Sequence, residues 1–174
     1  MRSTSEVDQK PRLPTPFERL DFESAWSWLL RYSFNDPLCA FKSLSGPRCT
    51  AHYYYGRLEA CSGLGGLLEI ADVAPKRLQQ PLTVDVEGTL CNGRFIADTL
   101  VDSSLDDFLV LDRLSFFGFE TPTAVCCSSI AEVARFRDSQ KELLCSSAEQ
   151  PVDGIVVRCK SLNGADRYDF VCVL

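Results

Sequence analysis

The sequence predicts an α+β fold built mainly on antiparallel sheets. Short segments rich in β-branched and aromatic residues are separated by turn signals, of which Asn92-Gly93 is the strongest. Two longer segments, 21–34 and 128–147, repeat apolar residues at helical spacing. No internal repeat is visible, so we expect a flexible polar arm over residues 1–16 and one folded domain over 17–174.

The elements follow from local patterns along the chain. Asp21 or Ser24 can cap the first helix, and the Asn-Asp-Pro at 35–37 stops it. A tight Asp-Gly turn is expected to lead into the strand at 151–161. In order, the expected elements are a helix at 21–34, a strand at 37–43, a hairpin at 48–63, a hairpin at 81–101, a sheet-interior strand at 106–118, a helix at 128–147, and strands at 151–161 and 166–174.

Composition excludes several classes of protein. The net charge of −6 argues against broad non-specific binding to nucleic acid, although it allows a local basic groove. No apolar run approaches the roughly 20 residues that cross a bilayer, so no membrane partner is expected. The nine cysteines lack C-x-x-C spacing, and His52 is the single histidine, which disfavours a structural zinc site. Free thiols and the lack of a signal-peptide core predict an intracellular, reducing compartment, the nucleus or the cytoplasm.

Charged residues interrupt segments that are otherwise apolar. Glu87, Asp112 and Asp153 each stand in such a segment, and Lys42 stands in the stretch CAFKSLSGPR. A buried charge without a partner is costly, so these carboxylates are candidates for an inward-facing cluster near a lysine. The structural alternative is that they mark turns or the solvent-facing side of a strand.

Taken together, these segments resemble motifs of the covalent nucleotidyltransferase superfamily, which contains mRNA capping guanylyltransferases and polynucleotide ligases. KSLSGPR resembles the lysine motif K-x-D-G-x-R, with Lys42 in the nucleophile position, followed by Gly46 and Arg48. VDVEGTL resembles the motif that carries a glutamate, here Glu87, and VDGIVV resembles the D/E-G motif at Asp153. FLVLDRLSFFG, around Asp112 and Gly118, resembles a further strand of the family.

The resemblance implies a fold and a set of site residues. The fold is a nucleotidyltransferase-like domain with two mainly antiparallel sheets around a cleft and no OB-fold. Lys42 is the implied catalytic nucleophile; it must lose its proton before it can attack the α-phosphate of GTP. A divalent metal, Mg²⁺ or Mn²⁺, would offset the charge that gathers in the transition state. The implied metal ligands are Glu87 and Asp153, and the implied nucleotide-binding residues are Arg48, Glu87, Phe116, Asp153, Arg158 and Lys160.

The sequence also departs from the family pattern. Three residues separate Lys42 from Gly46 where the family has two, and the family's aspartate is missing. Gly63 stands where ligases carry an arginine, and the last strand offers Arg167 in place of lysines. These departures weaken the case for the full catalytic cycle.

The prediction is a guanylyltransferase-like domain that forms a lysyl-GMP intermediate and passes GMP to an RNA 5′ end, with other capping-complex subunits or a separate OB-fold as partners. The alternatives are a catalytically degenerate subunit that binds nucleotide or scaffolds a capping or replication complex, a ligase-like adenylation domain, and an unrelated interaction module. The aspartate at position 153 and the missing ligase arginine favour capping over ligation.

Overall fold

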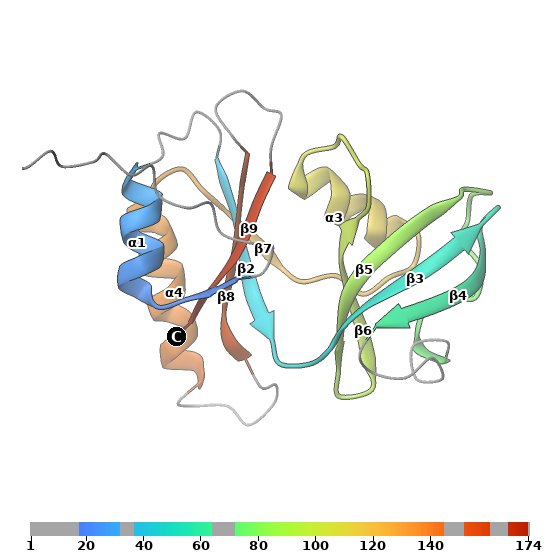
Figure 1. The fold of residues 1–174 in the computed structure, drawn as a ribbon, viewed down its shortest axis with the longest axis horizontal. Coiled ribbons are helices and arrows are strands. Elements are labelled where there is room, and N and C mark those ends of the chain that lie inside the picture. Colours follow the sequence, from blue (N-terminus) through green and yellow to red (C-terminus); the bar gives the residue numbers. More distant parts are fainter. Residues whose placement is uncertain (1–17, 32–36, 64–71, 145–151, 161–166, 174) are drawn as a thin grey trace, which may run out of the picture.

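The computed structural model describes residues 18–31, 37–63, 72–144, 152–160 and 167–173, and Figure 1 shows their arrangement. These residues form a mixed α+β fold with two mainly antiparallel sheets and no barrel, as the sequence predicts. The arm predicted over residues 1–16 lies outside the described residues.

The first sheet has five strands in the order β1-β9-β8-β2-β7. Neighbouring strands are antiparallel, except that β1 runs parallel to β9. The sequence patterns had indicated neither β1 nor β7, because both are too short to show an alternation of apolar and polar residues. The strands are β1 (Glu18–Leu20), β2 (Leu38–Leu44), β7 (Ala124–Cys127), β8 (Val152–Lys160) and β9 (Arg167–Val173).

The second sheet has four strands in the order β4-β3-β5-β6 and confirms both predicted hairpins. Two turns with positive φ angles close them, at Tyr55-Gly56 (φ 47° and 74°) and at Asn92-Gly93 (φ 51° and 71°). Positive φ at both central residues matches the twist of the flanking strands. The strands are β3 (Arg48–Tyr54), β4 (Arg57–Gly63), β5 (Val84–Cys91) and β6 (Arg94–Leu100).

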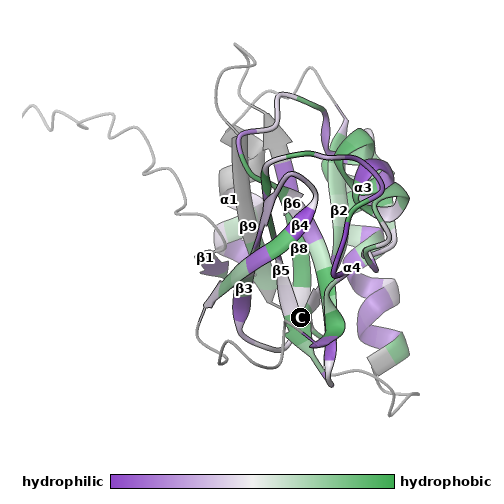
Figure 2. Ribbon diagram, turned by 90° about the vertical axis from the view of Figure 1, so that its right-hand side faces the viewer, coloured by the Kyte–Doolittle hydropathy of each residue, from purple (hydrophilic) through white to green (hydrophobic). Residues whose placement is uncertain are grey.

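Two helices cover one face of the five-stranded sheet (Figure 1): α1 (Phe22–Arg31) and α4 (Ile130–Leu144). Both confirm predicted helices. Ala25 of α1 and Val133 of α4 share a core with Ala40 and Ile155 of the sheet. Figure 2 shows hydrophilic residues over much of α4, as expected for a helix that packs on one side and meets solvent on the other.

The segment 106–118 is a helix, α3 (Asp107–Phe116), so the predicted strand there is wrong. Asp106 caps this helix: its side chain accepts a hydrogen bond from the backbone N–H of Leu109 at 3.0 Å. The buried apolar residues Val110, Leu111 and Leu114 follow helical spacing. The uninterrupted run FLVL suggested a strand interior, but the cap and the three- to four-residue period decide the structure.

Helix α3 lies between the two sheets (Figure 1) and contributes to a core on each side. Val110 and Leu114 pack into the core of the four-stranded sheet. Leu111 packs with Phe41 and Val156 of the five-stranded sheet. One helix therefore joins the hydrophobic cores of both sheets.

The predicted turn before the strand at 151–161 is also corrected, because Asp153-Gly154 lies inside β8. Ser43 pairs with Gly154 and Leu44 pairs with Val152, so Asp153 is the extra residue of a β-bulge. A Cβ on Gly154 would lie 2.6 Å from the backbone oxygen of Cys172 in β9, so the close approach of these strands requires glycine. The Asp153-Gly154 pair therefore forms a β-bulge within the sheet and not the predicted turn.

Among the side chains that the structure describes, seven cysteines are in the thiol form, and Cys126 is the exposed one of these. Burial raises the pKa values of the Cys61, Cys127 and Cys172 thiols. Within the same part of the chain, no helix has the length and apolarity needed to cross a membrane.

The position of α3 between two cores leads to a stability prediction. Leu114→Ala removes a fully buried side chain and is expected to lower the free energy of unfolding by about 2–5 kcal/mol. Leu109→Ala, on the same helix but with Leu109 51 % exposed, is the matched control and should change it by about 0.5 kcal/mol or less. Chemical denaturation measures both, and equal losses would contradict the placement of α3.

Candidate functional site

A bulge in β6 places Asp98 between the two sheets. Glu87 pairs with Thr99 and Gly88 pairs with Ala97, so Asp98 has no partner in the β5–β6 register. A Cβ on Gly88 would lie 2.2 Å from the backbone oxygen of Ile96, so only glycine allows the strands to approach here. The bulge leaves Asp98 almost completely buried.

Two arginines bind this carboxylate. Arg48 from β3 binds Asp98 with both terminal nitrogens, one of them 3.0 Å from Oδ1. Arg158 from β8 donates to Oδ1 at 2.9 Å and also to the backbone oxygen of Asp98. Thr99 completes the cluster, since its hydroxyl accepts from Arg158 and donates to Asp98, each at 2.7 Å.

Attraction between the opposite charges of the cluster offsets the cost of removing them from water. Burial alone would raise the pKa of Asp98, but the charges of Arg48 and Arg158 and the hydrogen bonds from Arg48 and Thr99 outweigh it, so the pKa lies below its usual range. Asp98 is therefore ionised near neutral pH. A buried carboxylate between two guanidinium groups requires both partners.

Arg158 connects the five-stranded sheet to this cluster. Its side chain is fully buried, and its guanidinium carbon lies 4.8 Å from the centre of the Phe41 ring. The sequence predicts that Arg158 contacts a nucleotide phosphate. The structure places it in an ion pair that holds β8 against β6.

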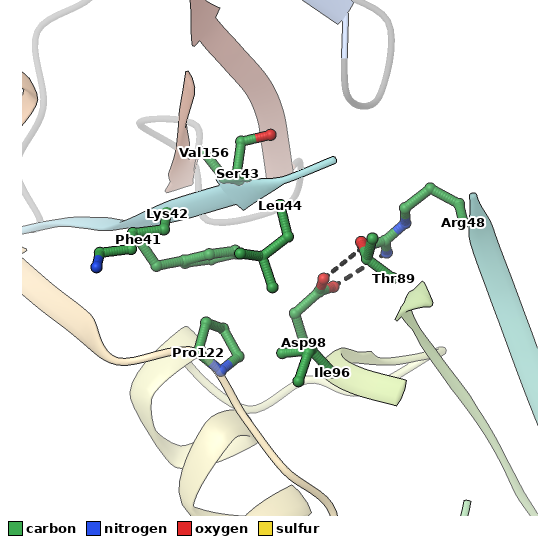
Figure 3. A pocket seen from close by; sticks show the side chains of 10 residues that line it. All are labelled: Phe41, Lys42, Ser43, Leu44, Arg48, Thr89, Ile96, Asp98, Pro122 and Val156. Carbon is green, nitrogen blue, oxygen red and sulfur yellow. Dashed lines mark hydrogen bonds and ion pairs between the residues drawn. The ribbon is translucent and has the colours of Figure 1, made fainter. Parts of the chain in front are cut away.

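A cleft of about 390 Å³ opens beside this cluster, at the end of β2. Lys42 and Leu44 of β2 and Ile96 of β6 line it, together with the connecting segment 120–123 and two residues of α4, Phe136 and Gln140. Lys42, Arg48 and Asp98 also line an adjoining hollow of about 20 Å³ (Figure 3). We call these two spaces the inter-sheet cleft.

Lys42 lies on the opposite face of β2 from the side chains that meet Arg158. It pairs with Ile155, which faces the core under α1 and α4, whereas Phe41 faces α3 and Arg158. Opposite residues of an antiparallel pair share a face, and successive residues of a strand alternate. Figure 3 shows the Lys42 amine directed away from the Arg48–Asp98 pair. The exposed amine and the two guanidinium groups thus do not converge.

The structure brings some of the other predicted site residues together. The carboxylate of Glu87 lies 3.7 Å from the Arg48 guanidinium, on the four-stranded sheet. Asp153 belongs to β8, which pairs with the Lys42 end of β2, but its side chain lies outside the described residues, as does that of Lys160. Phe116 is on α3, 54 % exposed, and lines neither part of the cleft.

Metal binding by Glu87 and Asp153 stays a prediction. Among the side chains that are described, no group of three or more His, Cys, Asp or Glu residues is placed to hold an ion. The Glu87 carboxylate forms an ion pair with a cation, Arg48.

Sequence reasoning missed Asp98, although a signal for it was present. In FIADTLV, an aspartate interrupts an apolar strand, as Glu87 does in VDVEGTL. The same rule about buried charges applied to β6 would have selected Asp98 and predicted a cationic partner. Comparisons give no further assignment, since no known family model and no curated protein match the sequence.

The ion-pair cluster leads to a prediction about acid stability. Asp98→Asn removes the buried carboxylate that Arg48 and Arg158 share and should cost about 3–5 kcal/mol at pH 7. Because the folded pKa of Asp98 lies below its unfolded value of about 3.9, its stabilisation is full above that pH and is lost as the pH falls through the folded value. The difference between wild type and variant should therefore narrow below about pH 4.

Urea denaturation at several pH values measures this difference. Asp102→Asn, at an exposed turn with a φ of 58° that asparagine tolerates, is the control and should stay close to wild type throughout. A pH-independent difference would show that the Asp98 charge is not what stabilises the cluster.

Proposed function

We propose that this chain is a nucleotide-binding domain that holds the phosphates of a nucleotide at Lys42 without transferring the nucleotide. The observation that carries the proposal is that the cations near the inter-sheet cleft differ in whether a carboxylate binds them. Arg48 and Arg158 bind Asp98, whereas Lys42 is exposed at the opening of the cleft.

The dimensions and chemistry of the cleft support a ligand of this size. A volume of about 390 Å³ falls in the range of small-molecule pockets, about 300–1,000 Å³. Apolar walls from Leu44, Ile96 and Phe136 suit a base or sugar, and a lysine binds phosphate as a point charge. The two arginines support the cleft wall, since their two positive charges are paired with the carboxylates of Asp98 and Glu87.

Group transfer requires more than binding. A lysyl-GMP intermediate needs an unprotonated amine in line with the α-phosphate, and cations that stabilise the transition state. Here the Lys42 amine is directed away from Arg48, and both arginines are bound to Asp98. This arrangement favours the catalytically degenerate nucleotidyltransferase-like subunit over the guanylyltransferase and over the ligase-like domain.

The second candidate is the active guanylyltransferase, and one observation favours it: Lys42 is exposed at a cleft between two sheets. In that case Glu87 and Asp153 would hold Mg²⁺ or Mn²⁺, and the RNA 5′ end would receive GMP. A capping complex would supply the partner subunits in either case.

Nucleotide binding tests the proposal. We expect saturable binding of fluorescent GTP or ATP analogues, and Lys42→Ala should weaken it about ten- to hundred-fold, because a charge-assisted contact contributes about 1.5–3 kcal/mol. Lys76→Ala, an exposed lysine near β4, is the matched control and should bind as wild type. Fluorescence anisotropy measures all three proteins.

A second experiment separates binding from transfer. The protein is incubated with α-labelled GTP or ATP and Mg²⁺ or Mn²⁺ and run on a denaturing gel. The proposal expects no label on the protein. Label that disappears in Lys42→Ala would establish the transferase, and failure to bind any nucleotide would leave neither function standing.

A further inference from the structure

The four-stranded sheet has a polar face, of which Arg48 and Thr89 at one end line the inter-sheet cleft, whereas His52 and Asp85 lie further along it and line neither part of the cleft. Cys49, Ala51 and Tyr53 of β3 point into the core, so Thr50 and His52 point to the other face. His52 lies on an inner strand of this sheet, because β3 is flanked by β4 on one side and β5 on the other.

His52 connects two side chains from these neighbouring strands. Its Nδ1 lies 2.9 Å from Oδ1 of Asp85 on β5, and its Nε2 lies 2.8 Å from Oγ of Ser62 on β4. An ionised aspartate only accepts hydrogen bonds, so in the neutral imidazole Nδ1 carries the proton and Nε2 has the lone pair. The Ser62 hydroxyl must then donate to Nε2.

We propose that Asp85, His52 and Ser62 form a nucleophilic serine site that accepts acyl groups from carboxylic esters. The order of the hydrogen bonds, carboxylate to imidazole to hydroxyl, is the one that activates a serine. This site is separate from the inter-sheet cleft and does not depend on nucleotide binding.

The reaction balances with these three residues, an ester and water. Ser62 Oγ bonds to the ester carbonyl carbon while its proton moves to Nε2 of His52. The carbon–alkoxy bond then breaks, and the alcohol leaves with that proton. Water attacks the acyl-serine, gives its proton to His52, and releases the acid as Ser62 recovers its proton. Asp85 holds the imidazole and stabilises its charged form.

The backbone fixes the position of the nucleophile. Gly63 has a φ of 138°, and a Cβ there would lie 2.6 Å from the backbone oxygen of Arg48, so β4 approaches β3 closely next to Ser62. Thr50 is the register partner of Ser62 and lies on the same face of the sheet, which makes its hydroxyl the candidate donor to the oxyanion.

A purely stabilising role explains the arrangement less well. The side chains of His52 and Asp85 are 35 % and 46 % exposed, and contacts between exposed polar groups add little to stability because water screens them. The same exposure lets an ester reach Ser62, which is itself exposed.

A fluorophosphonate probe tests the site directly. Attack by Ser62 Oγ forms an O–P bond and releases fluoride, and mass spectrometry locates the modified residue. We expect label on Ser62, no label there in Ser62→Ala, and labelling slowed about a hundred-fold in His52→Gln, which removes the base. Asp85→Asn should also slow labelling, because the carboxylate no longer orients the imidazole.

Two controls test whether labelling is specific to Ser62 and whether the His52→Gln variant is folded. Ser115→Ala, an exposed serine on α3, should label at the wild-type rate, and thermal melts should show that His52→Gln is folded. Absence of label in the wild type, or an equal rate in a folded His52→Gln, would overturn the proposal and show that the three side chains form only a surface hydrogen-bond chain.

Discussion

The ion pairs of Asp98 with Arg48 and Arg158 constrain the rest of the structure. They join β6 to β3 within one sheet and to β8 of the other. Asp98 and Arg158 are buried, and buried charges are costly unless they are paired, so the close approach of the two sheets depends on the contact between this carboxylate and this guanidinium group. The bulge at Asp98 and the close strand approach at Gly88 create that meeting point. Helix α3 then joins the cores of the two sheets.

This constraint also decides what the cleft can do. Asp98 binds both arginines and Glu87 lies 3.7 Å from Arg48, so carboxylates occupy the guanidinium groups that a phosphate would otherwise attract. Lys42 lies on the opposite face of β2 from Phe41 and Arg158. A lysine that meets a ligand alone can bind a phosphate, but a pentavalent transition state gathers more charge than one amine offsets. The proposed function therefore gives the cleft phosphate recognition and no group transfer.

Much of the fold could be predicted because its signals are local. The turns at Asn92-Gly93 and Tyr55-Gly56 fix two hairpins, and apolar periodicity identifies α1 and α4. Helix α3 was missed because an apolar run of four residues suits a buried strand as well as a helix, and only the Asp106 cap separates them. Asp98 could be suspected from FIADTLV, but its two partners lie 50 and 60 residues away, and no local pattern encodes such pairing.

The contacts of His52 are likewise pairings that no local sequence pattern encodes. Asp85, His52 and Ser62 are unremarkable on the alternating polar positions of their strands, where solvent exposure alone accounts for them. The pairing register of the strands brings these residues together. Because β3 lies between β4 and β5, the His52 imidazole contacts a hydroxyl on one side and a carboxylate on the other. A shift of one residue in either pairing would turn a partner to the core face. The contacts on this face therefore depend on the strand order β4-β3-β5, and no motif in the sequence predicts them.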